Sequence, residues 1–389
     1  MKLLVVSHAC VTPINQRFYA DVGELTKWEM TLVLPSTWST SYESHMRAER
    51  SERFTGSFRP VPVWKAGNVP LHLYKNAMTG ILREVRPDAI YMHHEPYGAA
   101  TFQLCLANSV RGNVPIGFYA AQNIEKKYPP PFRWIEQHVY ARSGFAFPCS
   151  VGALDVLRRK GYKGTAEVLP LPVELNLYKP MPEWAAATRA ERGIGADEFV
   201  IGYLGRLVEE KGLKTLLRAL AAGLPAQGWR CVLVGGGPLE AELRQLAAEL
   251  GIADRILFTG FVPHEQAAGW YSLFDVFVLP SETRPSWKEQ FGRVIIEANA
   301  CETAVIGTES GEIGNVLRST GGGLIVPEAN HQELGRAILA LMSNPAQRRE
   351  LAVKGAQVVR KQYNQTHLAG RFAAVIENAV QNRAGRRNG

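Results

Sequence analysis

The chain has 389 residues, of which 46% are hydrophobic, and it carries a formal net charge of +8. This length exceeds what one ordinary core fills and predicts two domains, each with its own hydrophobic interior. No apolar run approaches the roughly 20 residues that span a bilayer. The apolar run at residues 3–6 is too short for a signal peptide, so we expect a cytoplasmic protein.

The five cysteines are odd in number and widely spaced, which is typical of reduced core thiols and excludes a zinc-type spacing. Basic residues gather in two stretches, namely Arg47, Arg50, Arg53, Arg59 and Lys65, and Arg383, Arg386 and Arg387. Such charge favours anionic lipid, nucleic acid or phosphorylated substrates. No nucleic-acid-binding pattern accompanies it. We therefore expect peripheral contact with an anionic membrane and no nucleic-acid partner, with a merely solvated basic face as the alternative.

The first 170 or so residues alternate short apolar runs with helical periodicity, a pattern typical of βαβ units and a parallel sheet. Predicted strands are 2–8, 29–34, 89–92, 115–120 and 145–149, and predicted helices are 72–85, 97–107, 133–142 and 151–160. Residues 37–62 lack clear periodicity and are rich in Ser and Arg. They predict a mobile surface insertion that takes part in acceptor recognition.

Repeated prolines at residues 169–182 indicate an interdomain connection. The strands predicted beyond it are 199–204, 230–234, 255–259, 276–279, 304–306 and 324–326, and the helices are 213–222, 239–250 and 332–342. Asn344 and Pro345 are typical of the N-cap and first position of another helix, and residues 384–389 look disordered. The fold class is α/β, with two Rossmann-like doubly wound sheets whose ligands bind in a cleft at the carboxyl ends of the strands.

The loop after strand 199–204 contains Arg206 and Lys211 between glycines, just before a helix. Two cations beside a helix N-terminus indicate a site for a diphosphate, whose charge they would neutralise. A surface ion pair with Glu209 or Glu210 is the alternative interpretation.

Two further loops follow neighbouring strands. Gly235 and Gly237 lie in a glycine run that opens a helix, where backbone N–H groups can meet a nucleotide. This run is not the GxGxxG fingerprint, so a dinucleotide oxidoreductase is poorly supported. After strand 255–259, Phe261 and Val262 can present backbone groups to a base.

Residues 287–298 predict a polar loop that runs into a buried helix, with Glu289 at its open end and Glu297 about one and a half turns inside. Carboxylates in such places accept hydrogen bonds from hydroxyls, which suggests a sugar or a ribose. Alternatively, Glu289 complements the helix N-terminus and Glu297 ends a salt bridge.

In the first domain, His93 and His94 directly follow strand 89–92, and Glu95 and Pro96 come next. A histidine there is suited to a polar contact or to proton handling, although a structural histidine is an equal alternative. No HExxH or third-ligand spacing accompanies the pair, so no metal is predicted.

Together these motifs resemble the C-terminal domain of a retaining glycosyltransferase of family 4. The residues that carry the resemblance are Gly205-Arg206-Leu207, Lys211-Gly212, the 235–238 turn, Thr259-Gly260-Phe261, Glu289-Gln290-Phe291-Gly292 and Glu297-Ala298. The N-terminal half resembles the family more loosely, through His94-Glu95-Pro96 and Gln122-Asn123. The resemblance implies a GT-B fold, with an acceptor domain at 1–173, a donor domain at 174–365, and a C-terminal helix at 366–389 that packs back on the first domain.

The resemblance also implies a reaction: metal-independent, retaining transfer of a hexose-type sugar from a nucleotide-diphosphate sugar to a hydroxyl of a glycan or lipid-linked acceptor, in cell-envelope or exopolysaccharide biosynthesis. The donor is a co-substrate, and no cofactor is implied. A nucleotide-sugar epimerase and a non-catalytic nucleotide-sugar-binding protein are the competing classes.

By the same resemblance, Arg206 and Lys211 would bind the donor diphosphate and Glu297 the ribose. Glu289 and the backbone of Phe291 and Gly292 would hold the sugar, and His94 would contact it near the reacting carbon. Acceptor contacts are expected at Gln16, Arg17 and Asn123. Two segments depart from the family pattern: residues 7–17 replace a Gly-Gly loop, and residues 283–288 place bulky and basic side chains near the expected sugar pocket.

Overall fold

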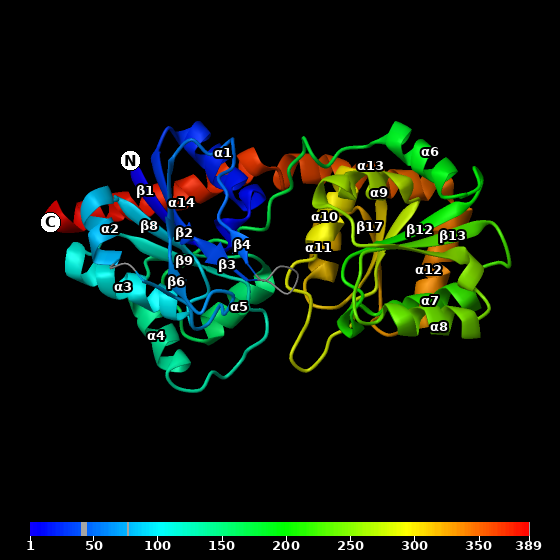
Figure 1. Ribbon diagram of the computed structural model, residues 1–389, viewed down its shortest axis with the longest axis horizontal. Helices are drawn as coiled ribbons and strands as arrows, with labels where there is room; N and C mark the ends of the chain where they lie inside the picture. The colour runs from blue at the N-terminus through cyan, green and yellow to red at the C-terminus, as the bar shows by residue number, and fades with distance from the viewer. Residues whose placement is uncertain (40–44, 76–77, 389) are drawn as a thin grey trace. The chain divides into compact units, whose positions relative to one another are not determined.

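The computed structural model describes residues 1–39, 45–75 and 78–388. The chain divides into two compact units, each built around its own sheet (Figure 1). Unit 1 combines Met1–Pro170 with the C-terminal segment from Gln365, and unit 2 is Leu171–Asn364.

Unit 1 contains a parallel sheet of seven strands in the order β11-β10-β9-β8-β1-β2-β5. The chain builds outward from β1 to β5 and then returns to the other side of β1 with β8, so the strand order reverses between β1 and β8. Open parallel sheets bind ligands at such a switch point, beyond the carboxyl ends of the strands. The strands are β1 (Lys2–Ser7), β2 (Glu29–Pro35), β5 (Ser57–Val61), β8 (Ala89–His93), β9 (Ile116–Ala120), β10 (Phe145–Pro148) and β11 (Thr165–Ala166).

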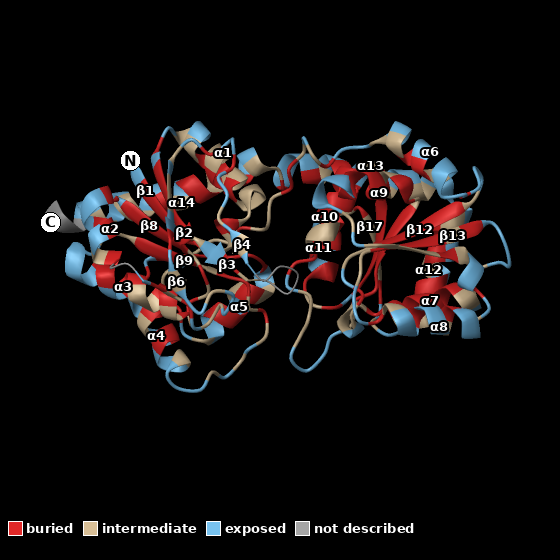
Figure 2. Cartoon of the chain, viewed as in Figure 1, coloured by how far each residue is buried: buried red, intermediate tan, exposed pale blue. Residues whose placement is uncertain are grey.

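Helices cover both faces of this sheet because successive side chains of a strand point to opposite sides. Leu3 and Val5 pack with α1 and α14 on one face, and Leu4 and Val6 pack with α2, α3 and α4 on the other. Figure 2 shows these strands buried and the outer helix surfaces exposed. The helices are α1 (Arg17–Thr26), α2 (Met78–Val85), α3 (Ala99–Arg111), α4 (Phe132–Arg142), α5 (Val151–Arg159) and α14 (Gln365–Asn388).

Unit 2 contains a parallel sheet in the order β14-β13-β12-β15-β16-β17. Numbered along the chain, these strands run 3-2-1-4-5-6, the order of the Rossmann fold, and the switch point lies between β12 and β15. The strands are β12 (Phe199–Leu204), β13 (Trp229–Val234), β14 (Ile256–Gly260), β15 (Val276–Leu279), β16 (Ala304–Thr308) and β17 (Gly323–Val326). The helices are α6 (Pro182–Glu191), α7 (Leu213–Gly223), α8 (Glu240–Glu249), α9 (Ala267–Leu273), α10 (Arg293–Ala300), α11 (Ile313–Thr320), α12 (His331–Ser343) and α13 (Pro345–Gln362).

The predicted strands are confirmed to within two residues, and Asn344 caps α13 through a side-chain bond to the Gln347 N–H. Three predictions were wrong. The start of the helix predicted at 72–85 was wrong, because Leu73–Tyr74 form β7, which pairs with β6 (Val63–Trp64); α2 is described from Met78, and residues 76–77 lie outside the described part of the chain. The 384–388 part of the predicted disordered tail continues α14 as helix.

The third error is the predicted insertion at 37–62, of which residues 40–44 lie outside the described part of the chain. It contains the short antiparallel pair β3 (Thr37–Trp38) and β4 (Met46–Arg47), and also β5, which pairs with β2. An edge strand leaves one side of its backbone unpaired, so it tolerates Pro60 and shows no clear apolar pattern.

All five cysteines are buried thiols, as expected of a reduced core. Burial raises the pKa of Cys105 to about 12. Over the described residues, no helix is both long and apolar enough to cross a membrane.

Candidate functional site

The switch point of unit 2 brings together Lys211 and Glu289, which were predicted from separate motifs. Lys211 ends a 3-10 turn (Glu209–Lys211) after β12, and Glu289 lies on the segment that joins β15 to α10. The Lys211 Nζ lies 2.6 Å from the Glu289 Oε2, and their side chains are 15% and 14% exposed. The ammonium also lies 4.9 Å from the centre of the Trp287 ring. A charged pair is thus held at the edge where this fold binds ligands.

Backbone contacts fix the loops around this pair. Gly212 adopts a left-handed φ of 65°, and a Cβ there would lie 1.9 Å from the Pro280 carbonyl oxygen. The N–H of Glu282 donates to the carbonyl of Glu210 at 2.9 Å, and the N–H of Glu312 donates to the carbonyl of Glu289 at 3.1 Å. The loops after β12, β15 and β16 therefore form one interlocked rim.

Arg206 projects from the same loop as Lys211. Its side chain is 51% exposed, and its guanidinium lies 3.6 Å from the Glu210 carboxylate. An exposed ion pair at this distance contributes little. The guanidinium can therefore turn to a stronger anionic partner such as a diphosphate.

The glycine loop after β13 packs directly against the Arg206 loop. A Cβ at Gly235 would lie 2.0 Å from the Gly205 carbonyl oxygen, and one at Gly237 would lie 2.3 Å from the Leu207 carbonyl oxygen. Both glycines are therefore required for loop-to-loop packing, whether or not their N–H groups also meet a nucleotide. Phe261, which follows β14, is 76% exposed, whereas Val262 packs partly against the core of unit 2.

Glu297 is 4% exposed, and protein groups contact both of its carboxylate oxygens. Arg293 Nε lies 3.0 Å from Oε1, and the Tyr271 hydroxyl donates to Oε2 at 3.1 Å. The structure thus contains the salt bridge at Glu297 that was the alternative to a ribose contact. Phe291 is 5% exposed and packs in the core, so only the backbone of Phe291 and Gly292 can serve a ligand.

The switch point of unit 1 gathers histidines. His94, which follows β8, is 3% exposed, and its Nδ1 lies 2.8 Å from the Nδ1 of His8, which follows β1. The Tyr74 hydroxyl lies 3.5 Å from the Nε2 of His94. Burial, reinforced by neighbouring histidines, lowers the pKa of His8 to about 3 and that of His94 well below its ordinary value. His94 is therefore a neutral hydrogen-bonding group near pH 7.

The three expected acceptor residues also lie in unit 1. The side-chain amide of Gln16 is fully buried: Nε2 donates to the carbonyls of Cys10 and Glu49, both at 2.7 Å, and Oε1 accepts from the Ser51 N–H at 2.8 Å. Gln16 thus fastens the segment around residue 50 and presents no face to a ligand. Arg17 begins α1, and Asn123 is 3% exposed in the loop after β9.

The basic stretch of unit 1 is largely paired within the protein. Arg59 forms a two-pronged contact with Glu84 at 2.7 and 2.8 Å, and Arg53 lies 2.5 Å from Asp21. Arg50 donates to two backbone carbonyls at 3.0 and 2.8 Å. These contacts reduce the charge that the stretch can offer to a membrane surface.

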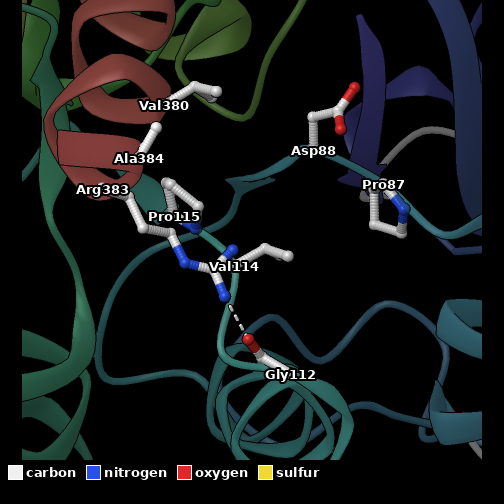
Figure 3. Close-up of a pocket in the computed structure, with 8 residues that line it drawn as sticks. All are labelled: Pro87, Asp88, Gly112, Val114, Pro115, Val380, Arg383 and Ala384. Carbon is white, nitrogen blue, oxygen red and sulfur yellow. Dashed lines mark hydrogen bonds between the residues drawn. The ribbon is translucent and has the colours of Figure 1, made fainter. Parts of the chain in front are cut away.

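A cavity of about 510 Å³ in unit 1 lies at the amino ends of the strands, opposite to the ends that carry the histidines (Figure 3). Asp88 and Pro115, which line it, precede β8 and β9, and the Arg383 side chain donates to the Gly112 carbonyl beside it. Because parallel sheets bind ligands at the carboxyl ends of their strands, this cavity is not the candidate site.

Sequence reasoning missed three residues of these sites: His8, Tyr271, and His72, whose ring centre lies 5.0 Å from that of His94. The rule that marked His94 also applies to His8, because both follow central strands of the same sheet. His72 and Tyr271 come from a short strand connection and from α9, and no motif marks either of them.

Known proteins share this architecture. A glycosyltransferase from Rickettsia africae superposes with a TM-score of 0.76 at 16% identity, covering 98% of this chain and 99% of that one. Anabaena HepE in complex with UDP gives a TM-score of 0.74 at 18% identity, covering 97% and 100%. At this identity the similarity shows the fold, which is the GT-B fold of glycosyltransferases.

Sequence comparison defines the family. The profile of Glycosyl transferases group 1 matches residues 186–383, and the chain belongs to this family and is a glycosyltransferase.

Alpha-D-kanosaminyltransferase of Streptomyces kanamyceticus is 25% identical over 82% of this chain and 84% of its own length. The GDP-mannose-dependent alpha-(1-6)-phosphatidylinositol monomannoside mannosyltransferase of Mycobacterium tuberculosis is 31% identical over 55% of this chain. The chain spans only 56% of the length of that relative.

Proposed function

We propose that the protein transfers a hexose-type sugar, with retention and without a metal ion, from a nucleotide-diphosphate sugar to a hydroxyl of a glycan or lipid-linked acceptor. The observation that carries this proposal is the Lys211–Glu289 pair at the switch point of unit 2, next to the half-exposed Arg206. The names of related proteins add support, since they include a GDP-mannose-dependent mannosyltransferase and a lipopolysaccharide core glycosyltransferase.

The reaction breaks the bond between the anomeric carbon and the diphosphate oxygen, and it forms a bond from that carbon to the acceptor oxygen on the same face. The O–H bond of the acceptor also breaks, and its proton passes to the leaving diphosphate oxygen. Negative charge develops on the leaving diphosphate. Lys211 and Arg206 supply positive charge there, which is the role that a divalent cation has in other enzymes. Glu289 holds the Lys211 ammonium in place before the donor binds, and its carboxylate can accept hydrogen bonds from sugar hydroxyls.

His94 is proposed to contact the sugar, which requires its ring to exchange a present partner, either His8 at Nδ1 or Tyr74 at Nε2. Glu297 is proposed to bind the ribose hydroxyls: Arg293 and Tyr271 hold its carboxylate in place, and each oxygen keeps a further lone pair for a hydroxyl. A place in cell-envelope or exopolysaccharide synthesis is part of the same proposal.

A thermal-shift screen against UDP, GDP, ADP and their sugar conjugates, with and without EDTA, tests donor binding. A ligand at many times its dissociation constant should raise stability by a few kcal/mol. One base should give a shift that EDTA leaves unchanged. If no nucleotide shifts the transition, the proposal fails.

Two other functions predict different outcomes in the same preparation. A nucleotide-sugar epimerase would convert the bound nucleotide sugar with no acceptor present. A non-catalytic binding protein would show the shift but release no nucleoside diphosphate with any acceptor. For the transferase, NMR of the product should show the anomeric configuration of the donor retained, and inversion would contradict that part of the proposal.

Peripheral contact with anionic lipid is proposed only as a secondary feature, because Arg50, Arg53 and Arg59 have partners within unit 1. Trp64, Arg47 and Lys65 are exposed side chains of this region that suit a membrane surface. Co-sedimentation should increase with anionic lipid and fall with salt. Sedimentation that ignores both would remove the membrane from the proposal.

A further inference from the structure

Three histidines from distant parts of the chain converge at the switch point of unit 1. His8 follows β1, His94 follows β8, and His72 directly precedes β7. One ring nitrogen from each lies within 4.8 Å of the other two. His72 and His94 are 1% and 3% exposed, while His8 is half-buried, so the cluster opens towards solvent only on the side of His8.

The Nε2 atom of His72 is buried without a hydrogen-bond partner among the described residues. Its Nδ1 lies 2.9 Å from the Val69 carbonyl oxygen, which can only accept, so Nδ1 carries the proton. The lone pair of Nε2 is therefore directed elsewhere, and this buried atom has no hydrogen-bond partner within the described structure. A buried polar atom without a partner is rare, and an ion or a water is its ordinary explanation.

His8 and His94 turn one ring nitrogen each toward the other. Two Nδ1 atoms 2.8 Å apart form an N–H···N hydrogen bond when one of them carries the proton, and a metal ion would take the place of that proton. Both Nδ1 atoms offer a lone pair to an ion when each ring carries its proton on Nε2. The Tyr74 hydroxyl lies on the far side of the His94 ring, 3.5 Å from Nε2, where an outer partner orients a metal-binding imidazole.

We propose that His8, His72 and His94 form a binding site for a transition-metal ion such as Zn²⁺. Three neutral imidazoles suit Zn²⁺, Co²⁺ or Ni²⁺, whereas Mg²⁺ and Ca²⁺ prefer oxygen ligands. Three protein ligands with one open position are typical of zinc sites that exchange water or substrate. Zn–N bonds of about 2.0–2.1 Å at tetrahedral angles separate nitrogens by about 3.4 Å, so the two Nδ1 atoms move apart by roughly half an ångström on binding.

This site goes beyond the proposed function, which needs no metal. It shares His94 with that function, so metal loading is expected to change sugar transfer. Nucleotide binding, proposed for unit 2, should stay unchanged. Failure of metal binding and failure of the transferase proposal can therefore be told apart.

The test uses the full chain without an affinity tag, stripped with a chelator and dialysed. Titration with Co²⁺ should give the visible absorption of a tetrahedral site, saturating at one ion per chain, and Zn²⁺ should displace it while excess Mg²⁺ should not. His72→Gln should weaken Co²⁺ binding by at least the roughly 10- to 100-fold that loss of an outer-shell partner alone costs. The matched control His331→Gln, at the start of α12, should bind normally.

His8→Gln provides a second variant, because the half-exposed His8 tolerates substitution better than the buried His72. It should also weaken Co²⁺ binding while the thermal transition and the nucleotide shift stay near wild type. The proposal is overturned if the stripped chain takes up no Co²⁺ or Zn²⁺, or if both variants bind Co²⁺ as tightly as wild type. A water on the Nε2 of His72 would then explain why that atom has no partner among the described residues.

Discussion

Lys211 is the residue on which the proposed chemistry depends most. Lys211→Ala removes the ammonium that would neutralise the leaving diphosphate, so turnover should fall by roughly 10²- to 10³-fold, as for other preorganised donors to a developing anion. Stability should fall by only about 1–3 kcal/mol, from the unpaired Glu289. Initial rates of nucleoside diphosphate release and a thermal melt measure both effects.

Lys214→Ala is the control for that experiment. Lys214 lies one turn further along, 25% exposed, and contacts Glu209 at 2.6 Å and Glu242 at 2.7 Å. It belongs to the same helix start but not to the Glu289 contact. Its loss should leave turnover near the wild-type value. Equal losses in the two variants would mean that general charge, and not the Lys211 position, drives the rate.

The sequence identified charged site residues that follow parallel strands, but it did not identify the residues that these side chains contact. Arg206 and Lys211 were identified because charged residues after parallel strands lie at one edge of the sheet, and Glu289 because it lies at the open end of a loop that runs into a buried helix. The Lys211–Glu289 contact joins residues 78 positions apart, and local pattern carries no information on it. Gln16 was expected to contact the acceptor, but its amide is buried and bonded within the protein. The sequence does not distinguish a buried amide from an exposed one.

Gln16→Ala should therefore act on stability. It leaves the buried Cys10 carbonyl and the buried Ser51 N–H without their partner, and also the partly exposed Glu49 carbonyl. Each unsatisfied buried group costs about 1–3 kcal/mol, so we expect a loss of at least about 2 kcal/mol in urea unfolding. Gln245→Ala, which removes only an exposed contact to Glu249, should change stability by less than about 0.5 kcal/mol. A small effect at Gln16 would return it to the candidate acceptor residues.

At the level of elements, periodicity identified strands and helices that bury one face, and failed where packing overrides it. Strand β5 was missed because an edge position relaxes its composition. Helix α13 was predicted from its cap, but nothing in the sequence explains Gly355 at its middle, where glycine weakens a helix. The structure explains it: a Cβ at Gly355 would lie 2.7 Å from Asn299 Cγ and 2.8 Å from the Gly322 Cα.

Gly355→Ala should consequently destabilise unit 2 by about 1–3 kcal/mol, the usual range for overpacking, despite the better helix propensity of alanine. The matched change Gly370→Ala lies in α14, where the added Cβ would meet only Leu25 Cδ2 at 3.8 Å. At this position the better helix propensity of alanine should raise the free energy of unfolding by up to about 1 kcal/mol. Thermal melts of the two single variants should move in opposite directions, and a gain at both would show that α13 can shift away from Asn299.

At the scale of the whole molecule, the sequence predicted two doubly wound sheets because each half alternates strand and helix on its own. Periodicity alone does not show which core each C-terminal helix joins. The packing of the last helix on the first domain was implied only by the family resemblance. Unit 2 closes its core within Leu171–Asn364. Unit 1 instead draws on α14, which lies almost 200 residues beyond the last strand of its sheet.

A chain that ends at Asn364 should therefore lose the fold of unit 1 and keep that of unit 2. Leu368, Phe372 and Ile376 of α14 are fully buried against α1 and the sheet of unit 1. Burying each contributes about 1.5–3 kcal/mol, so their combined loss approaches the 5–15 kcal/mol of a typical domain. Hydrogen exchange should show lost protection in residues 1–170 and retained protection in residues 171–364. Truncation after Asn382 spares these three side chains and should leave both units protected. Retained protection of unit 1 without α14 would show that α1 and the sheet form a sufficient core alone.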